Sequence, residues 1–217
     1  MRLSFPREKR PLMRGHLHLG AAFVAPIALA VLLLLAETPR AYVGAASFGI
    51  GLILLYSVSA AYHLVRWKPH VRGVVARIDQ ANIFIFIAAS YTPFCLVMSP
   101  PWQATLLPLV WTLAIGGAVA RAAWPGMPRS VAVVGYLALG WVGIAAAPEL
   151  VRIVEPAGLV LLVIGGLAFS AGALAYALRW PDPVPHVFGY HEVFHTCVVV
   201  GTAVHYGVVA GWVIHLP

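Results

Sequence analysis

Seven long apolar runs, separated by short polar or proline-containing breaks, constrain this chain more than any other feature. Hydrophobic residues make up 61% of its 217 residues and charged residues only 10%, whereas a soluble domain carries about a quarter charged residues. The apolar residues come in continuous runs and do not alternate as in amphipathic helices or strands, which is typical of transmembrane helices. We therefore predict an all-α polytopic membrane protein, with one seven-helix domain over residues 16–217 behind a short basic tail, residues 1–15.

The breaks predict where each span begins and ends. The expected transmembrane helices cover residues 16–36, 41–65, 78–98, 102–124, 130–147, 156–178 and 190–214. The fifth is short and is expected to end before Pro148. Cys95 and Cys197 both fall inside spans, so we expect packed core residues and no disulfide. The basic start leads into the first span without a small-residue cleavage site, so we expect no cleavable signal peptide.

The cationic residues predict the orientation in the membrane. With the N-terminus inside, twelve of the fourteen Lys and Arg residues fall on the inner side, and only Arg40 and Arg152 fall outside. Cytoplasmic loops carry the excess of Lys and Arg, so we place the N-terminus in the cytoplasm and the C-terminus outside. The net charge of +7 is then a topology signal, and we expect no nucleic-acid partner.

This orientation brings five polar residues to one depth beneath the cytoplasmic face. Ser59 and His63 lie near the inner end of the second span, and Asp79 lies at the inner end of the third. His191 and His195 lie at the inner end of the seventh span, four residues apart and so on one helix face. Charge alone predicted the orientation, so this convergence independently favours a shared site.

Three imidazoles at one depth are typical of a catalytic zinc site. Such zinc keeps a fourth position for water and lowers the pKa of that water to about 7. We expect zinc as the cofactor, with His63, His191 and His195 as its ligands. Asp79 would accept the proton of the water or orient it. Ser59 shares a helix face with His63 and would donate a hydrogen bond to a substrate oxygen; both are our candidate catalytic residues.

Simpler interpretations of single polar residues stay open beside this one. At the start of a helix Asp79 could be only an N-cap. His205 is expected to make an interhelical hydrogen bond. Glu192, rotated about 100° from the histidine before it, is expected to face a loop or a basic partner. His16 and His18 lie near the inner edge of the first span and could be interfacial.

Residues 191–195 also match H-E-x-x-H, the zinc-protease helix in which the glutamate is the general base. No acidic residue follows Glu192 that could serve as a third ligand. The longer form of the motif fails as well, because Val198 and Gly201 stand where its glycine and third histidine belong. An intramembrane zinc protease is therefore an alternative that ranks second, and haem held by intramembrane histidines is a third.

Five segments taken together resemble the hemolysin III family, the bacterial branch of the progestin and adipoQ receptor group, which includes the adiponectin receptors and is related to alkaline ceramidases. The segments are residues 59–63 (SAAYH), 77–83 (RIDQANI), 90–94 (SYTPF), 179–181 (RWP) and 191–195 (HEVFH). The resemblance implies seven helices and a zinc site near the cytoplasmic face. It places zinc on His63, His191 and His195, with Asp79 and Ser59 as the accompanying aspartate and serine. It also implies hydrolysis of lipid amides, while the family name reflects a cytolytic activity of some members.

Two departures from the family pattern are visible. Gln80 stands where bacterial members often have histidine, and the first span lacks an acidic, Asn-containing lead before its histidine, which weakens any role for His18. We expect an integral protein of the bacterial inner membrane whose partners are membrane lipids, and a zinc-dependent, ceramidase-like hydrolase of lipid amides or esters. The alternative is a non-enzymatic sensor, transporter or cytolysin-like protein with structural zinc.

Overall fold

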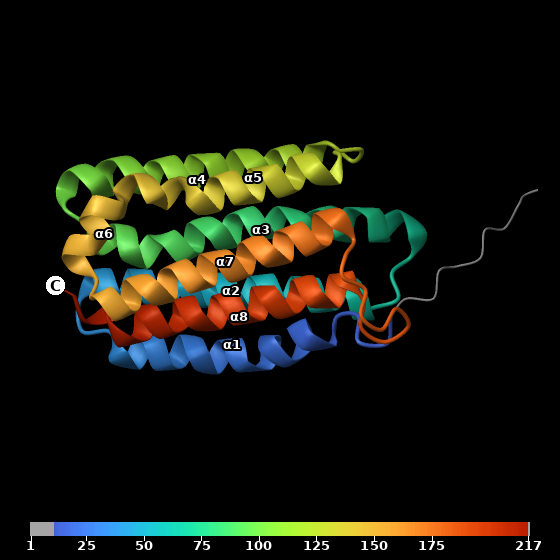
Figure 1. Ribbon diagram of the computed structural model, residues 1–217, viewed down its shortest axis with the longest axis horizontal. Helices are drawn as coiled ribbons and strands as arrows, with labels where there is room; N and C mark the ends of the chain where they lie inside the picture. Colours follow the sequence, from blue (N-terminus) through green and yellow to red (C-terminus); the bar gives the residue numbers. More distant parts are fainter. Residues whose placement is uncertain (1–10, 217) are drawn as a thin grey trace, which may run out of the picture.

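The structure is a computed structural model, and it describes residues 11–216. The first ten residues of the expected basic tail, with four of its five cationic side chains, lie outside the described residues. Within 11–216, seven helical segments are long and apolar enough to cross a membrane. They run side by side along the long axis of the molecule (Figure 1). The predicted all-α fold with seven spans is confirmed.

The helices pack mainly against their neighbours in the chain, α1 on α2, α2 on α3, α3 on α4 and α7 on α8. The fifth span consists of three helical pieces, and the seventh ends in a short 3-10 turn. The elements are α1 (His16–Leu35), α2 (Pro39–Leu64), α3 (Pro69–Val97), α4 (Pro100–Ala123), α5 (Arg129–Trp141), η1 (Val142–Ala146), α6 (Ala147–Ile153), α7 (Pro156–Leu178), α8 (Tyr190–Gly211) and η2 (Val213–His215).

Proline marks the start of four of the spans. Pro39, Pro69, Pro100 and Pro156 are the first residues of α2, α3, α4 and α7. The first helical position suits proline, because its missing N–H would have no partner there and its φ already fits a helix. Thr38 adds a side-chain cap to α2 by accepting the Ala41 N–H at 3.1 Å. The breaks between the apolar runs are therefore also helix starts.

The third span begins nine residues earlier than predicted, at Pro69 and not at residue 78. Asp79 consequently lies ten residues inside the helix, about 15 Å along its axis at 1.5 Å per residue. The interpretation of Asp79 as a helix cap is wrong, because Lys68 occupies the N-cap position of α3.

The fifth span extends beyond its predicted end. Pro148 does not terminate it; the chain tightens into η1 at Val142 and resumes as α6, so the span runs to Ile153. Pro148 lies at the start of α6, where proline is accepted for the same reason as in the other helices.

The break between α5 and α6 is supported by groups from other helices. The Tyr91 hydroxyl donates to the Gly140 carbonyl at 2.5 Å and accepts the Gly143 N–H at 2.9 Å. Buried Glu149 accepts the Ser99 N–H at 2.8 Å. Irregular backbone at membrane depth is stable only where such partners lie inside the protein. The broken helix therefore depends on α3 and on the start of α4.

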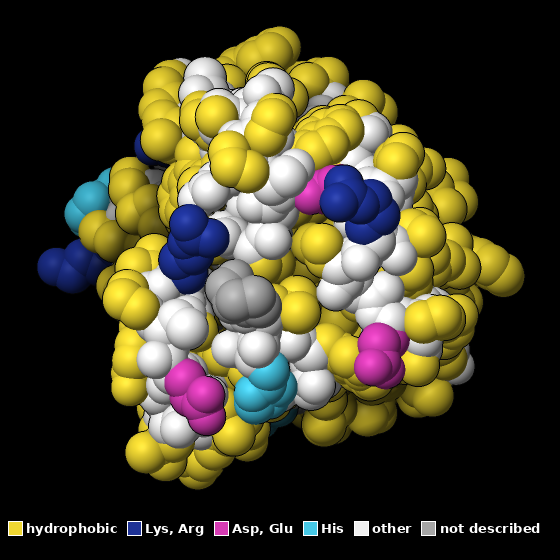
Figure 2. Space-filling model, turned by 90° about the vertical axis from the view of Figure 1, so that its left-hand side faces the viewer, with side chains coloured by type: hydrophobic (Ala, Val, Ile, Leu, Met, Phe, Trp, Pro, Cys, Tyr) yellow, Lys and Arg dark blue, Asp and Glu magenta, His cyan; other side chains and the backbone are white. Residues whose placement is uncertain are grey.

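The two ends of the bundle differ. In Figure 1 the described chain begins at one end and the C-terminus lies at the other. Figure 2 looks onto the end that bears the C-terminus, where charged side chains are few and scattered among apolar ones. The number of spans is odd, and the cations gather at the end opposite the C-terminus. Both features agree with the orientation expected from the sequence, which remains a prediction.

A buried ion pair ties the start of α1 to the start of α8. Arg14 Nε lies 2.5 Å from Glu192 Oε1, and the Glu192 side chain is 1% exposed. Glu192 Oε2 also accepts the Gly189 N–H at 2.8 Å and so caps α8. The segment before α1 hydrogen-bonds through its backbone to the α7–α8 loop, from Leu12 N–H to the His186 carbonyl and from Met13 N–H to the Val187 carbonyl. The expectation of a basic partner for Glu192 is confirmed.

The charge split predicts that a reporter fused to the C-terminus and active only outside the cytoplasm will be active on this chain, because the termini of a seven-span bundle lie on opposite sides. The same reporter fused after Arg66, between the second and third spans, should be silent. If only the fusion after Arg66 were active, the protein would have the opposite orientation to the one predicted.

Removing Arg14 should destabilise the protein strongly. Arg14→Ala leaves the Glu192 carboxylate buried without its cation, which costs about 3–5 kcal/mol of unfolding free energy. The double variant Arg14→Met/Glu192→Gln should recover most of that loss, since no charge stays buried. Melting temperature and denaturant unfolding in detergent measure both.

Arg152→Ala is the matched control. It removes the cation of the Arg152–Glu149 pair, whose arginine side chain is 74% exposed and whose glutamate side chain is 5% exposed. Water can replace the exposed guanidinium and Glu149 keeps the Ser99 N–H, so the loss should be smaller than for Arg14→Ala. Similar losses for Arg14→Ala and Arg152→Ala would contradict a special role for the buried pair.

Candidate metal centre and its cavity

Three histidines converge at the end of the bundle opposite the C-terminus (Figure 1). His63 comes from the last turn of α2, and His191 and His195 come from the first two turns of α8. Their ligand nitrogens all lie within 4.8 Å of one another. The Nε2 atoms of His63 and His191 are 3.1 Å apart. In a tetrahedral zinc site, Zn–N distances of about 2.0–2.1 Å place ligand nitrogens about 3.3 Å apart, so the cluster is of the right size for such an ion.

The donor set also fits a metal cation. His195 is 2% exposed and His63 is 9% exposed, and the three rings contact one another with centroids 4.6–5.1 Å apart. Two neutral imidazoles facing each other through Nε2 satisfy only one hydrogen bond between them. A single cation at their centre can accept a lone pair from all three rings. These residues can therefore hold a metal ion.

His18 is a member of this centre that sequence reasoning missed. Its ring stacks on the His195 ring, with centroids 3.8 Å apart and planes 7° from parallel. It is 2% exposed, and neither ring nitrogen has a hydrogen-bond partner within residues 11–216. The interfacial interpretation is wrong for His18, whereas His16 is exposed as expected at an interface. Residues two apart lie about 200° apart on a helix, and nothing in the sequence says which of the two faces inward.

Asp79 and Ser59 line the same cavity as the three histidines. Ser59 is 3% exposed, and its side chain lies beside the Asp79 carboxyl group. No ion pair in the described part of the chain includes Asp79. The five residues singled out from the sequence thus line one cavity, and three of them, the histidines, lie within metal-binding distance of one another; the catalytic and ligand roles remain predictions.

Glu192 does not share this position. Its carboxylate is occupied by Arg14 and by the Gly189 N–H, and Glu192 is not among the residues that line the cavity. A zinc-protease helix needs that glutamate beside the metal as general base. The arrangement therefore does not support the intramembrane protease alternative.

Gln80, the departure from the family pattern, has a structural partner. Its Oε1 accepts a hydrogen bond from Arg121 Nε at 2.5 Å, and Arg121 is buried in α4. The Gln80 carbonyl also accepts the Tyr136 hydroxyl from α5 at 2.9 Å. This residue therefore joins α3 to α4 and α5 beside the candidate site.

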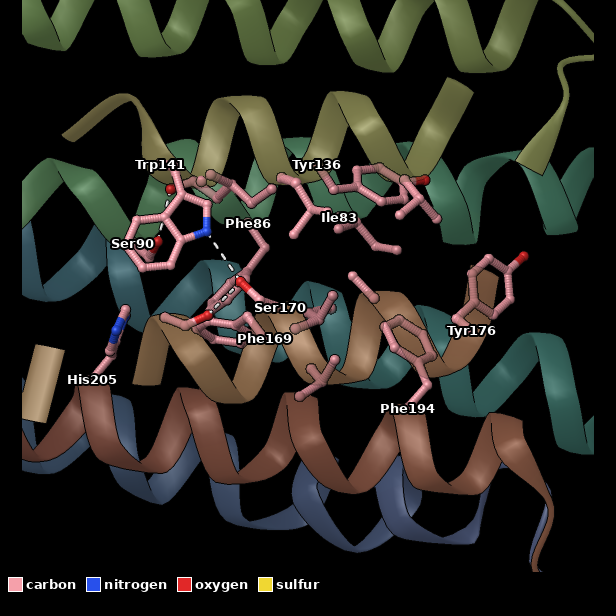
Figure 3. Close-up of a pocket in the computed structure, with 18 of the residues that line it drawn as sticks. Ile83, Phe86, Ser90, Tyr136, Trp141, Phe169, Ser170, Tyr176, Phe194 and His205 are labelled. Carbon is pink, nitrogen blue, oxygen red and sulfur yellow. Dashed lines mark hydrogen bonds between the residues drawn. The ribbon is translucent and has the colours of Figure 1, made fainter. Parts of the chain in front are cut away.

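A cavity of about 640 Å³ leads away from the histidines. It lies among α3, α5, α7 and α8, and Figure 3 shows aromatic and aliphatic side chains pointing into it from these helices. Arg14, Arg72 and Arg129 line its end beside the histidines, while Leu150 and Leu159 line its far end. Its volume is within the range of small-molecule sites. Its length and apolar wall suit a hydrocarbon chain, and nothing in the sequence predicted it.

His205 lies along this cavity, ten residues beyond His195 on α8 and about 15 Å from it along the axis. Its Nε2 lies 3.1 Å from the Leu162 carbonyl of α7. The expected interhelical hydrogen bond is confirmed, and His205 is not part of the metal-sized cluster.

Replacing His191 or His195 with Ala should abolish bound metal or weaken it greatly, because each change removes one of three strong ligands. His205→Ala is the matched control on the same helix and should retain the metal. Metal content of the purified variants, measured by mass spectrometry of the elements, tests this. Equal loss in all three variants would refute the ligand assignment.

Comparison with known proteins shows the family of this chain. The family described as "Haemolysin-III related" matches residues 7–206. "Hemolysin-3" of Bacillus cereus is 31% identical over 189 residues, which cover 85% of this chain and 83% of that protein. "Hemolysin-3 homolog" of Bacillus subtilis (strain 168) is 30% identical over 171 residues, covering 78% and 77%.

The likeness extends beyond bacteria. "Monocyte to macrophage differentiation factor" of Homo sapiens is 30% identical over 166 residues, which cover 73% of this chain and 66% of that protein. Seven apolar helices, a buried three-histidine cluster at one end of them, and a family match over nearly the whole chain lead to one conclusion: the protein is an integral membrane protein of the hemolysin III family.

Proposed function

We propose that this protein is a zinc-dependent hydrolase of lipid amides or esters. The observation that carries the proposal is the continuity of the buried histidine centre with a long apolar cavity inside the membrane-spanning bundle. A structural metal needs no such cavity beside it, whereas a lipid carbonyl can reach the histidines only if its chain has a place to lie.

Each residue of the candidate site would have a distinct role in the proposed hydrolysis. His63, His191 and His195 would hold the zinc through their ring nitrogens. The cavity would take the acyl chain, exclude bulk water and hold the carbonyl beside the histidines. The Asp79 carboxylate would accept the proton of the attacking water and return it to the leaving nitrogen or oxygen. The Ser59 hydroxyl would donate to a substrate oxygen or orient the carboxylate.

Zinc, when bound, would supply a Lewis acid that polarises the carbonyl and lowers the pKa of water. Three histidine ligands leave a fourth position open, as in catalytic zinc sites. His18 stacks on His195 with both nitrogens unpaired in the described chain, so it would restrict the orientation of that ligand ring by packing.

The second candidate is a non-enzymatic membrane protein with structural zinc, and the name of the Bacillus relatives, hemolysin, points to cytolysis. Such a protein would retain zinc and show no turnover of any lipid. The two functions are separated by measuring hydrolysis of long-chain N-acyl amides and esters by the zinc-loaded protein in detergent.

Asp79→Asn tests the proposed mechanism. The change keeps the shape of the side chain but removes the base, so zinc should stay bound while hydrolysis falls by about 10²-fold or more. If the carboxylate instead mainly compensates the metal charge, zinc content and melting temperature should fall together. All three quantities are measured on one preparation.

Glu155→Gln is the matched control for exchanging a carboxylate for an amide. Glu155 Oε2 accepts the Trp212 indole N–H at 3.1 Å at the other end of the bundle, so zinc and turnover should not change. Full activity of Asp79→Asn would remove the general base from the mechanism, and absence of lipid hydrolysis by the zinc-loaded parent protein would overturn the proposed function.

A further inference from the structure

Four polar side chains interrupt the apolar wall of the cavity away from the histidine centre. They come from four helices, with Ser90 on α3, Trp141 at the end of α5, Ser170 on α7 and His205 on α8. Figure 3 shows them pointing into the space beside Phe86 and Phe169. We call these four residues the distal polar cluster.

Contacts on α7 hold the cluster together. Trp141 Nε1 donates to Ser170 Oγ at 3.0 Å. The His205 ring lies edge-on to the Phe169 ring, with centroids 5.3 Å apart, and a side chain at Gly165 would collide with it. Ser90 lies at the same level, because the next residue, Tyr91, bonds to Gly140, the neighbour of Trp141.

All the donors of the cluster are used inside the protein. Ser90 Oγ donates to the Ile87 carbonyl at 2.7 Å, and Ser170 Oγ donates to the Gly166 carbonyl at 2.8 Å. His205 Nε2 faces a carbonyl, which only accepts, so this nitrogen carries the hydrogen.

What remains in the cluster is acceptor capacity. With its hydrogen on Nε2, the neutral His205 ring presents Nδ1 as an acceptor. The Ser90 hydroxyl oxygen also retains lone pairs. No described residue donates to either atom. The cluster therefore offers acceptors to the cavity and no donor.

A ligand that satisfies the cluster must bring a hydrogen-bond donor. An ammonium group would place an unpaired charge in an apolar cavity, which is costly. A hydroxyl group is neutral and donates, so it fits. His205 lies ten residues beyond His195, so a carbonyl at the histidines and a hydroxyl at the cluster are about 15 Å apart.

We infer that the cavity selects lipids whose acyl chain carries a hydroxyl group about 15 Å from the carbonyl, with its one O–H donating to either Ser90 Oγ or His205 Nδ1. The inference rests on the proposed function for the placement of the carbonyl, and it adds a chain specificity to it. A chain without the hydroxyl would cover these acceptors and give neither of them a donor, which lowers its affinity.

Helix packing alone explains part of the cluster. Serines in membrane helices often bond their own backbone, and His205 joins α8 to α7. Packing explains where the donors go, but it does not require acceptors that face the cavity. If packing were the only role, hydroxylated and plain chains would bind equally.

The test is equilibrium binding to the purified full-length protein, so that it does not depend on hydrolysis. A fluorescent fatty acid is displaced by octadecanoic acid, by the same acid hydroxylated at carbon twelve, or by the acid hydroxylated at carbon six. The carbon-twelve acid should bind about tenfold more tightly than the plain acid, equivalent to about 1.4 kcal/mol. The carbon-six acid, whose hydroxyl would lie short of the cluster, should show no gain.

Ser90→Ala and His205→Leu each remove one acceptor, and the variant that removes the acceptor used by the hydroxyl should bring the tenfold preference towards equality while plain acid still binds. Ser47→Ala and His215→Leu are matched controls, because Ser47 donates to the Ala89 carbonyl and His215 Nε2 faces the Ala210 carbonyl, and neither lines the cavity. Melting temperatures show whether each variant is folded. If His205→Leu does not fold, Ser90→Ala, the smaller change, still tests the inference.

Equal affinity for the plain and carbon-twelve acids, or a preference that survives both acceptor variants, would overturn the inference. Lipid hydrolysis is assayed separately. A hydroxyl preference without hydrolysis supports the inference about the distal polar cluster and overturns the proposed function. Hydrolysis without the preference supports the proposed function and overturns the inference.

Discussion

A polar group at membrane depth has no water to bond, so it must find its partner inside the protein. In this chain the requirement decides how the half of the bundle that bears the three histidines is built. Glu192 is fully buried and takes both Arg14 and the Gly189 N–H as partners. That pairing fixes the start of α8 and so the positions of the two histidines in its first two turns. The candidate metal centre therefore depends on an ion pair whose two residues are not among its three histidines.

The same requirement accounts for the cavity. Tyr91 and Glu149 supply partners for backbone groups where the fifth span breaks and where α4 begins. The break directs the chain into η1 and α6, and Trp141 is held by a hydrogen bond to Ser170 of α7. These polar contacts hold α5 beside α3 and α7 and leave an apolar space among them. A cavity made in this way keeps polar atoms in its wall, which is why the distal polar cluster exists.

Sequence reasoning succeeded where one physical signal dominated. Apolar runs separated by polar or proline-containing breaks predicted most helix bounds to within two residues, and the order of the spans predicted that the three histidines meet at one end of the bundle. It failed where two signals competed. Residues 69–77 carry His70, Arg72 and Arg77 and look unlike a membrane span, yet they form the first turns of α3. Pro148 is a residue expected just after a helix end, but it lies in the first turn of α6. Tertiary packing alone decides which of His16 and His18 faces the protein interior. The cavity also arises from tertiary packing, so the sequence pattern could not predict it.

Metal binding and folding cannot be separated in such a site. His63 and the two histidines of α8 are more than a hundred residues apart in the chain and meet only when α2 and α8 are both in place. A cation that binds them adds its binding free energy to the folded state only. Arg14 both lines the cavity and holds Glu192, so a change at Arg14 would weaken the metal centre through the position of α8, with every ligand still present. Loss of metal in a variant therefore identifies a ligand only when α8 is shown to remain in place.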